Sequence, residues 1–263
     1  LTGWVTLDNK SGTTYRNARL KLVAGDVNRV LERYGQYDGI QRLEEVAAKS
    51  ASSQFNEKAF FEYHLYSLQR PTTIKENQTK QVTLLSANKI PVAKRFIYYG
   101  AEYYYRSRYG VPVSNQKVGV YVEVSNKEEN HLGIPLPKGT IRVYKADTDR
   151  SLQFIGEDQI DHTPKDETIK IKMGEAFDLV AERKQTDWRK ISDNIYEMAF
   201  EVSIRNHKDS KVVVNVIEPI PGDWEILQSS HDYKKIEAHT VQFDIPVEKD
   251  REGRLKYRVR VRF

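Results

Sequence analysis

The sequence contains no cysteine, which excludes disulfides, thiolate nucleophiles and cysteine-ligated metals. This absence suits a cytosolic protein and an exported protein equally well. The chain also lacks any apolar run approaching the ~18 residues that cross a bilayer. No Gly-x-Ser-x-Gly, His-Glu-x-x-His or phosphate-binding loop is present, and the 6 histidines are scattered. We therefore expect a non-enzymatic protein without a cofactor.

The chain also lacks a large excess of charge of either sign. Lys and Arg total 42 against 37 for Asp and Glu, which leaves a net charge of +5. Nucleic-acid binding proteins concentrate their basic residues, whereas these charges are mixed along the chain. We expect no nucleic-acid partner. With 263 residues, the chain is long enough for one large domain or for two to three small ones.

The residues that are present alternate between apolar and charged over long stretches. Successive side chains of an extended strand point to opposite faces, so alternation predicts a half-buried β-strand. The last nine residues are the clearest case, and we interpret their basic row as solvation and protection of a sheet edge. The apolar row is Leu255, Tyr257, Val259, Val261 and Phe263, and the basic row is Lys256, Arg258, Arg260 and Arg262.

Three passages share one layout, in which a strand ends in Asn, a polar turn and a second strand follow, and a late strand closes the passage. The three residues are Asn9, Asn126 and Asn206. An Asn side chain at a strand end can bond backbone groups in the following turn. We predict tandem immunoglobulin-like or fibronectin-like β-sandwich modules at residues 1–89, 90–175 and 176–263. Independent strands with the same local pattern, or two larger sandwiches, remain alternatives.

The first passage is longer than the second by about the length of Asn28 to Phe55, which we interpret as an insertion. Apolar residues within Ile40 to Ala48 follow helical spacing and predict one short amphipathic helix. The chain opens at Leu1 inside an expected strand. We therefore expect a natural N-terminal part, with any targeting segment, to precede it.

Three segments carry a resemblance to a known family: LTGWVTLDNKSGTTYRNARLKLVAGDVN, LGIPLPKGTIRVYKADTDRSLQFIGEDQIDHTPKDE and ERKQTDWRKISDNIYEMAFEVSIRNHK. They resemble the C-terminal domain of unknown function of bacterial envelope proteins, including those described as mucoidy-inhibitor-like. The resemblance runs from Leu1 to Phe263. It implies an exported bacterial protein, periplasmic or extracellular, and it brings no catalytic or ligand-binding residues with it.

The densest group of aromatic and basic residues is the tyrosine segment, residues 98–110. Tyrosine rings stack on sugars or bases, and their hydroxyls and nearby arginines bond polar groups, so a carbohydrate or peptide groove is one interpretation. The other is an edge strand whose rings pack on neighbouring modules. Single-stranded nucleic acid is disfavoured by the charge balance. The candidate contact residues are Tyr98, Tyr99, Tyr103, Tyr104, Tyr105, Arg106, Arg108 and Tyr109.

A weaker candidate site follows at Asp158, Asp161 and His162. Carboxylates and an imidazole can bind a divalent ion such as Ca²⁺. However, no calcium-loop or paired-histidine spacing is present, and Pro164 followed by charges reads as a solvated turn. We therefore predict no metal and keep a Ca²⁺ site as the alternative.

These observations together predict an exported structural or interaction protein of the bacterial envelope. It would contact a protein partner, or itself, through sheet edges and surfaces between modules. A carbohydrate-binding module, with surface polysaccharide as partner, is the alternative. A metal-dependent hydrolase is the second alternative.

Overall fold

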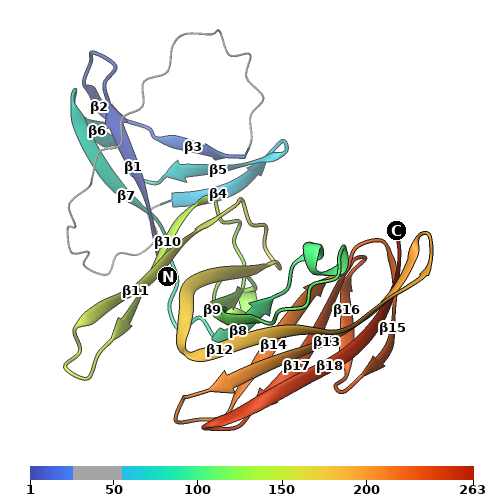
Figure 1. Ribbon diagram of the computed structural model, residues 1–263. Coiled ribbons are helices and arrows are strands. Elements are labelled where there is room, and N and C mark those ends of the chain that lie inside the picture. The colour runs from blue at the N-terminus through green and yellow to red at the C-terminus, as the bar shows by residue number, and fades with distance from the viewer. Residues whose placement is uncertain (26–54) are drawn as a thin grey trace. The chain divides into compact units, whose positions relative to one another are not determined.

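The computed structural model describes residues 1–25 and 55–263. Within these ranges the chain forms β-strands, turns and two short 3-10 helices, with no α-helix (Figure 1). The prediction of an all-β fold is confirmed. The predicted insertion, Asn28 to Phe55, lies outside the described residues together with its helix, except for Phe55 itself. Strand β4 begins at Phe55. No helix in the described ranges is long and apolar enough to cross a membrane.

The described chain folds into two compact units. The first comprises residues 1–91, 124–139 and 159–169 and contains small antiparallel sheets in which β1 pairs with β7, β2 with β6, and β5 with both β3 and β4. Its core includes the buried Phe55 and Tyr66, and the Tyr66 hydroxyl donates to the carbonyl of Pro135 at 2.8 Å. Its strands are β1 (Thr2–Asn9), β2 (Tyr15–Ala18), β3 (Lys21–Ala24), β4 (Phe55–Phe60), β5 (Tyr63–Leu68), β6 (Thr72–Ile74) and β7 (Gln78–Ser86).

The second unit comprises residues 92–123, 140–158 and 170–263 and is built on a nine-stranded mixed sheet. The strand order is β15-β18-β13-β12-β9-β8-β14-β17-β16. The elements from residue 92 onward are β8 (Val92–Tyr99), η1 (Glu102–Tyr105), β9 (Val113–Ser125), η2 (Glu128–Asn130), β10 (Gly139–Ala146), β11 (Leu152–Ile160), β12 (Thr168–Ser192), β13 (Ile195–Asn206), β14 (Val212–Pro219), β15 (Asp223–Ser229), β16 (Tyr233–Glu237), β17 (Thr240–Val247) and β18 (Arg251–Arg262).

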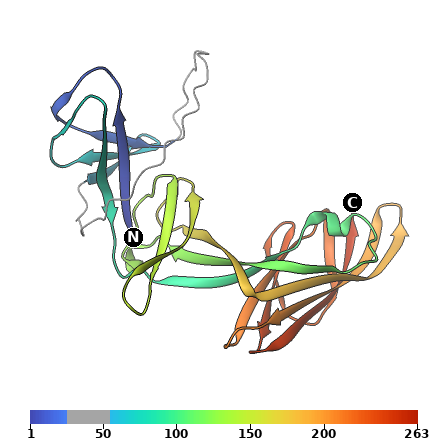
Figure 2. The same ribbon diagram turned by 60° about the vertical axis from the view of Figure 1, so that its left-hand side comes forward.

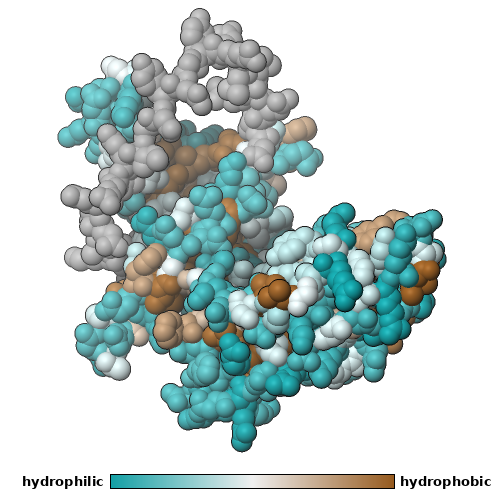
Figure 3. All heavy atoms as spheres, in the orientation of Figure 1, coloured by the Kyte–Doolittle hydropathy of each residue, from teal (hydrophilic) through white to brown (hydrophobic). Residues whose placement is uncertain are grey.

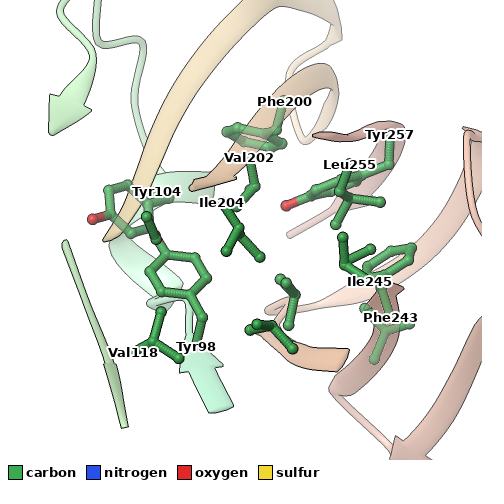
Figure 4. Packing of buried hydrophobic residues seen from close by; sticks show 14 of the residues in the cluster. Tyr98, Tyr104, Val118, Phe200, Val202, Ile204, Phe243, Ile245, Leu255 and Tyr257 are labelled. Carbon is green, nitrogen blue, oxygen red and sulfur yellow. The ribbon is translucent and has the colours of Figure 1, made fainter. Parts of the chain in front are cut away.

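This sheet folds back on itself and encloses the main core. β17 and β18 are far apart in the strand order, yet they contact each other. Gly253 permits the approach, since a Cβ there would lie 2.8 Å from a methyl carbon of Val247. Side chains from both ends of the sheet therefore meet, as with Phe243 of β17 and Tyr257 of β18, whose ring centres are 5.2 Å apart (Figure 4). Figure 2 shows the same bend from the side.

The alternation predicted for the last residues is present in β18, whose Leu255, Tyr257, Val259 and Val261 are buried. The interpretation of its basic row as edge protection is wrong, because β18 lies between β13 and β15. Two of the four cations in this row instead face acids directly across from them on β13. Arg260 pairs with Glu197 at 2.7 Å and Lys256 with Glu201 at 3.2 Å. Such cross-strand pairs stabilise a sheet, so the row is part of its interior pairing.

The three strand-end asparagines occupy like settings, and each is buried. Each side-chain amide donates to a carbonyl in the turn that follows and to one just before the late strand, while each Oδ1 accepts a backbone N–H. The predicted turn bonding of these residues is therefore confirmed. The carbonyls belong to Thr13 and Lys75 for Asn9, to Ile134 and Pro164 for Asn126, and to Ser210 and Glu248 for Asn206.

The outer face of the second unit is mostly hydrophilic in the view of Figure 3, with hydrophobic side chains in small separate groups. The charges predicted for solvated strand faces account for this. The structure describes two compact units. The boundaries of the three sandwich modules stay a prediction.

Candidate functional site

The tyrosine segment connects β8 to β9 through the short 3-10 helix η1. Two backbone bonds of the tight i to i+3 type define this turn: Tyr104 donates to Ala101 at 3.1 Å and Arg106 to Tyr103 at 3.2 Å. Residues three apart share a face of a 3-10 helix. The turn therefore divides its side chains into an inward set and an outward set.

The inward set consists of Tyr98, Tyr104 and Tyr105, which are 1%, 3% and 0% exposed. Their rings belong to the main core, where Tyr98 and Tyr104 lie near Val118 (Figure 4). Gln116 links two of them, since its Oε1 accepts from the Tyr98 hydroxyl and its Nε2 donates to the Tyr104 hydroxyl at 3.1 Å. These rings offer no surface to a ligand and serve to pack the sheet.

Beneath these rings lies a buried ion pair between Arg183 of β12 and Glu218 of β14, both 0% exposed. Tyr105 donates to Glu218 Oε2 at 2.9 Å, and Arg183 Nη2 donates to the Tyr257 hydroxyl at 2.9 Å. The Tyr105 and Tyr257 hydroxyls are 2.7 Å apart and bond each other. We call these four residues the buried network. It joins β12, β14, β18 and the tyrosine segment.

Aromatic rings complete the surroundings of the Arg183 guanidinium. Its carbon lies 4.4 Å from the ring centres of both Tyr104 and Phe200, at cation–π distance, and its Nε donates to the Tyr109 hydroxyl at 3.2 Å. None of the buried polar side-chain atoms of the network lacks a partner. A charged pair that is fully enclosed and fully bonded presents nothing to a substrate, so its role is structural.

The electrostatics of the network fix its protonation states. Burial alone would lower the pKa of Arg183, but the Glu218 carboxylate and nearby tyrosines outweigh burial and hold that pKa well above its usual value. Burial raises the pKa of Tyr105 and of Tyr257 well above the ordinary tyrosine value. Arg183 therefore stays cationic and both hydroxyls stay protonated across the physiological pH range.

Gly100 is required by this network. A Cβ at that position would lie 2.0 Å from Glu218 Oε2, far inside contact distance. The backbone N–H of Gly100 also donates to the carbonyl of Ile217 at 2.8 Å, which holds it beside β14. Glycine, which has no Cβ, permits this close approach of the backbone to Glu218.

The outward set includes Tyr103, which is 62% exposed, and the exposed Arg106 one turn later. The guanidinium carbon of Arg106 lies over the ring of Phe263, 6.0 Å from the ring centre. Tyr196 contacts Phe263, and Trp188 contacts Tyr196, with ring centres 5.9 and 5.4 Å apart. We call these five residues the aromatic–arginine surface. All of them belong to the second unit.

The other predicted contact residues are placed differently. Tyr99 is 48% exposed and its ring meets Tyr121 edge-on at 6.2 Å. Arg108 is exposed. Tyr109 is half-buried, and its hydroxyl accepts a hydrogen bond from Arg183. The eight predicted residues thus do not form one groove.

The weak metal candidates have separate partners. Asp158 accepts from the backbone N–H of Lys172 at 2.7 Å, and His162 Nδ1 faces the backbone N–H of Lys138 at 3.2 Å. Asp161 uses its backbone carbonyl to accept from the Thr163 hydroxyl at 2.8 Å. Across the described ranges, no three His, Asp or Glu side chains gather in a way that could hold a metal ion.

Sequence reasoning did not find Arg183, Glu218 or Tyr257. A signal for the first two exists in the strand alternation. Val214 and Val216 share a strand face with Glu218, and Leu179 and Ala181 share one with Arg183. A charged residue at a position that alternation places inside indicates a buried partner elsewhere in the chain.

Comparison with protein-family models finds no match for this chain, and comparisons with curated proteins and with solved structures find none either. The family resemblance inferred from the sequence therefore stays a prediction.

Proposed function

We propose that this chain is a non-enzymatic interaction protein that binds a protein partner through the aromatic–arginine surface. The observation that carries this proposal is the exposure of Tyr103 and Arg106 beside three further aromatic rings. Tyr, Trp and Arg are the residues enriched in the energetic centres of protein interfaces. The resemblance noted above favours the bacterial envelope as the setting.

The rigid base of this surface supports the proposal. The ring of Tyr103 lies 4.3 Å from that of Tyr104, which in turn faces the Arg183 guanidinium. Side chains that are held in place before binding lose little conformational entropy when a partner docks. The buried network thus contributes to binding indirectly, by fixing the position of η1.

Side-chain contact is better supported than pairing with an added strand. The free edges of the large sheet are β15 and β16, and both contain a bulge. Strand β16 also carries Lys234 and Lys235. Bulges and lysines at edges hinder pairing with another strand. The proposal that sheet edges bind the partner therefore has weaker support than the aromatic–arginine surface.

We also propose that the chain is a tandem of immunoglobulin-like or fibronectin-like sandwich modules. The like settings of Asn9, Asn126 and Asn206 support three related copies, since each buried amide ties a turn to the segment before a late strand. Strand pairing agrees with this, because β1 pairs with β7, β9 with β12, and β13 with β18.

The binding proposal is tested by placing a photoreactive phenylalanine analogue at position 103 in the cells that produce the chain. A discrete crosslinked protein is expected there, and Arg106→Ser should abolish it. Tyr233, which is 44% exposed on β16, is the control position. Identical products at both positions, or none at position 103, would refute the proposal. If the crosslinked partner is a second copy of this chain, light scattering on the purified chain should show a dimer. A monomer indicates that the partner is a different protein.

A further inference from the structure

A notch opens in the nine-stranded sheet between β8 and β14. These strands run parallel, but they pair only from Phe96 to Tyr99 and from Val214 to Ile217, although both begin earlier. The strands therefore separate before Phe96, and the gap holds a cavity of about 390 Å³. That volume lies in the range of small-ligand sites.

The lining of the notch is cationic. Four basic side chains contribute to it, while no carboxylate does. The remaining lining combines hydroxyl, amide and apolar groups. The lining residues on which the argument rests are Lys94, Arg95, Phe96, Lys208, Ser210 and Lys211.

The cations differ in how far they are already neutralised. Arg95 pairs with Glu123 at 2.9 Å, Lys208 with Asp178 at 3.0 Å and Lys211 with Glu248 at 2.6 Å.

Lys94 has no ion-pair partner within the described part of the chain. Its ammonium lies 4.9 Å from the ring centre of Phe96, and the Lys208 ammonium lies 5.6 Å from the same ring. Both ammonium groups thus lie close to one ring, and only that of Lys208 is paired with a carboxylate. An anion that binds beside the ring would meet the charge of Lys94.

The loop that supplies half of the notch is held in place. Asn206 is 1% exposed, and its amide donates to the Ser210 carbonyl at 2.9 Å while its Oδ1 accepts from the Lys208 N–H at 2.9 Å. The His207 N–H donates to the Asp178 carbonyl at 2.9 Å. Lys208 and Ser210 are therefore positioned before any ligand arrives, as a binding site requires.

We propose that this notch binds a small ligand that carries two neighbouring oxyanion groups. One group is bound by Lys94 of β8, which shares a strand face with Phe96. The other is bound by Lys208 and Ser210 of the loop before β14. The site shares no residue with the aromatic–arginine surface, so each proposal can be refuted without affecting the other.

Titration calorimetry on the full chain at low salt tests this site, with inorganic pyrophosphate and citrate as probes. Charge-assisted hydrogen bonds are worth enough that Lys94→Gln should weaken binding about tenfold. Lys208→Gln should have a similar effect. Lys256→Gln is the matched control, because Lys256 is exposed and pairs with one carboxylate. Lys94 is exposed, so its variant is expected to fold.

Binding of either probe that is weakened by the Lys94 variant and unchanged by the Lys256 variant supports the site. A preference for pyrophosphate assigns phosphate-type ligands, and a preference for citrate assigns carboxylates. Absence of binding for both probes at about 1 mM overturns the proposal. Equal weakening by the Lys94 and Lys256 variants overturns it as well, because that result indicates attraction by overall charge.

Discussion

Removing one partner of the buried ion pair should destabilise the second unit strongly. In Glu218→Gln the Arg183 guanidinium stays buried at 0% exposure without a counter-charge. Breaking a buried pair in this way costs about 3–5 kcal/mol. A domain's total stability is about 5–15 kcal/mol, so this single change removes a large share of it. Arg183→Met should cost a similar amount.

The double variant Arg183→Met/Glu218→Leu separates the pair's charge from its packing. Replacing both members by apolar residues leaves no isolated charge, and such replacements are often nearly neutral. The Tyr105 and Tyr257 hydroxyls, which are 2.7 Å apart, can still form a hydrogen bond with each other. We therefore expect the double variant to be more stable than either single variant by at least about 2 kcal/mol.

Guanidinium unfolding followed by tryptophan fluorescence measures these differences. The chain has 3 tryptophans, and Trp4 is the one in the first unit. A Trp4→Phe background therefore leaves Trp188 and Trp224 to report on the second unit alone. Lys190→Gln is the control, since its exposed pair with Asp193 should matter by less than about 1 kcal/mol. A Glu218→Gln cost no larger than this control would refute the reasoning. So would costs of the single variants Arg183→Met and Glu218→Leu that simply add in the double variant.

Three further predictions concern the same unit. Gly100→Ala should lower its melting temperature by displacing the nearby carboxylate, whereas Gly110→Ala, with nothing within 4 Å of its Cβ, should change it little in a thermal scan. Asn206→Ala should cost about 1–3 kcal/mol in denaturant unfolding, because buried carbonyls lose their donor. The raised pKa values of Tyr105 and Tyr257 mean that folding favours their neutral forms, so their contribution to stability is present below the ordinary tyrosine pKa and is lost as pH rises. In an alkaline titration, exposed tyrosines should ionise first, and a later increase in tyrosinate absorbance should coincide with unfolding.

Local pattern in the sequence was sufficient for the strands and for the strand-end turns. Alternation predicted the buried side of β18, and Asn chemistry predicted the amide bonds made by Asn206. Both follow from neighbours along the chain. The position of β18 within the sheet was not predictable in this way, because it depends on which strands pair. The basic row was therefore assigned to a sheet edge, although β18 lies inside the sheet and Lys256 and Arg260 lie opposite acids of β13.

The buried network shows why the candidate site was harder to predict. Its bonds join residues far apart in sequence, as with Tyr105 and Glu218, separated by 113 positions, and Tyr105 and Tyr257, separated by 152. Alternation indicates that Glu218 points inward, but it does not say which cation meets it. Only the bend of the nine-stranded sheet brings the partners together.

The tyrosine segment combines two roles that composition alone could not separate. Tyr103 and Tyr105 differ by two positions, yet one is 62% exposed and the other 0%. Replacing both would remove an outward contact and a buried hydrogen bond at once, so lost binding could reflect lost folding. Because η1 places Tyr103 and Arg106 one turn apart on the outside, variants confined to these two residues change the surface and leave the network intact. A binding loss in such variants, with an unchanged unfolding curve, assigns the function to the surface itself.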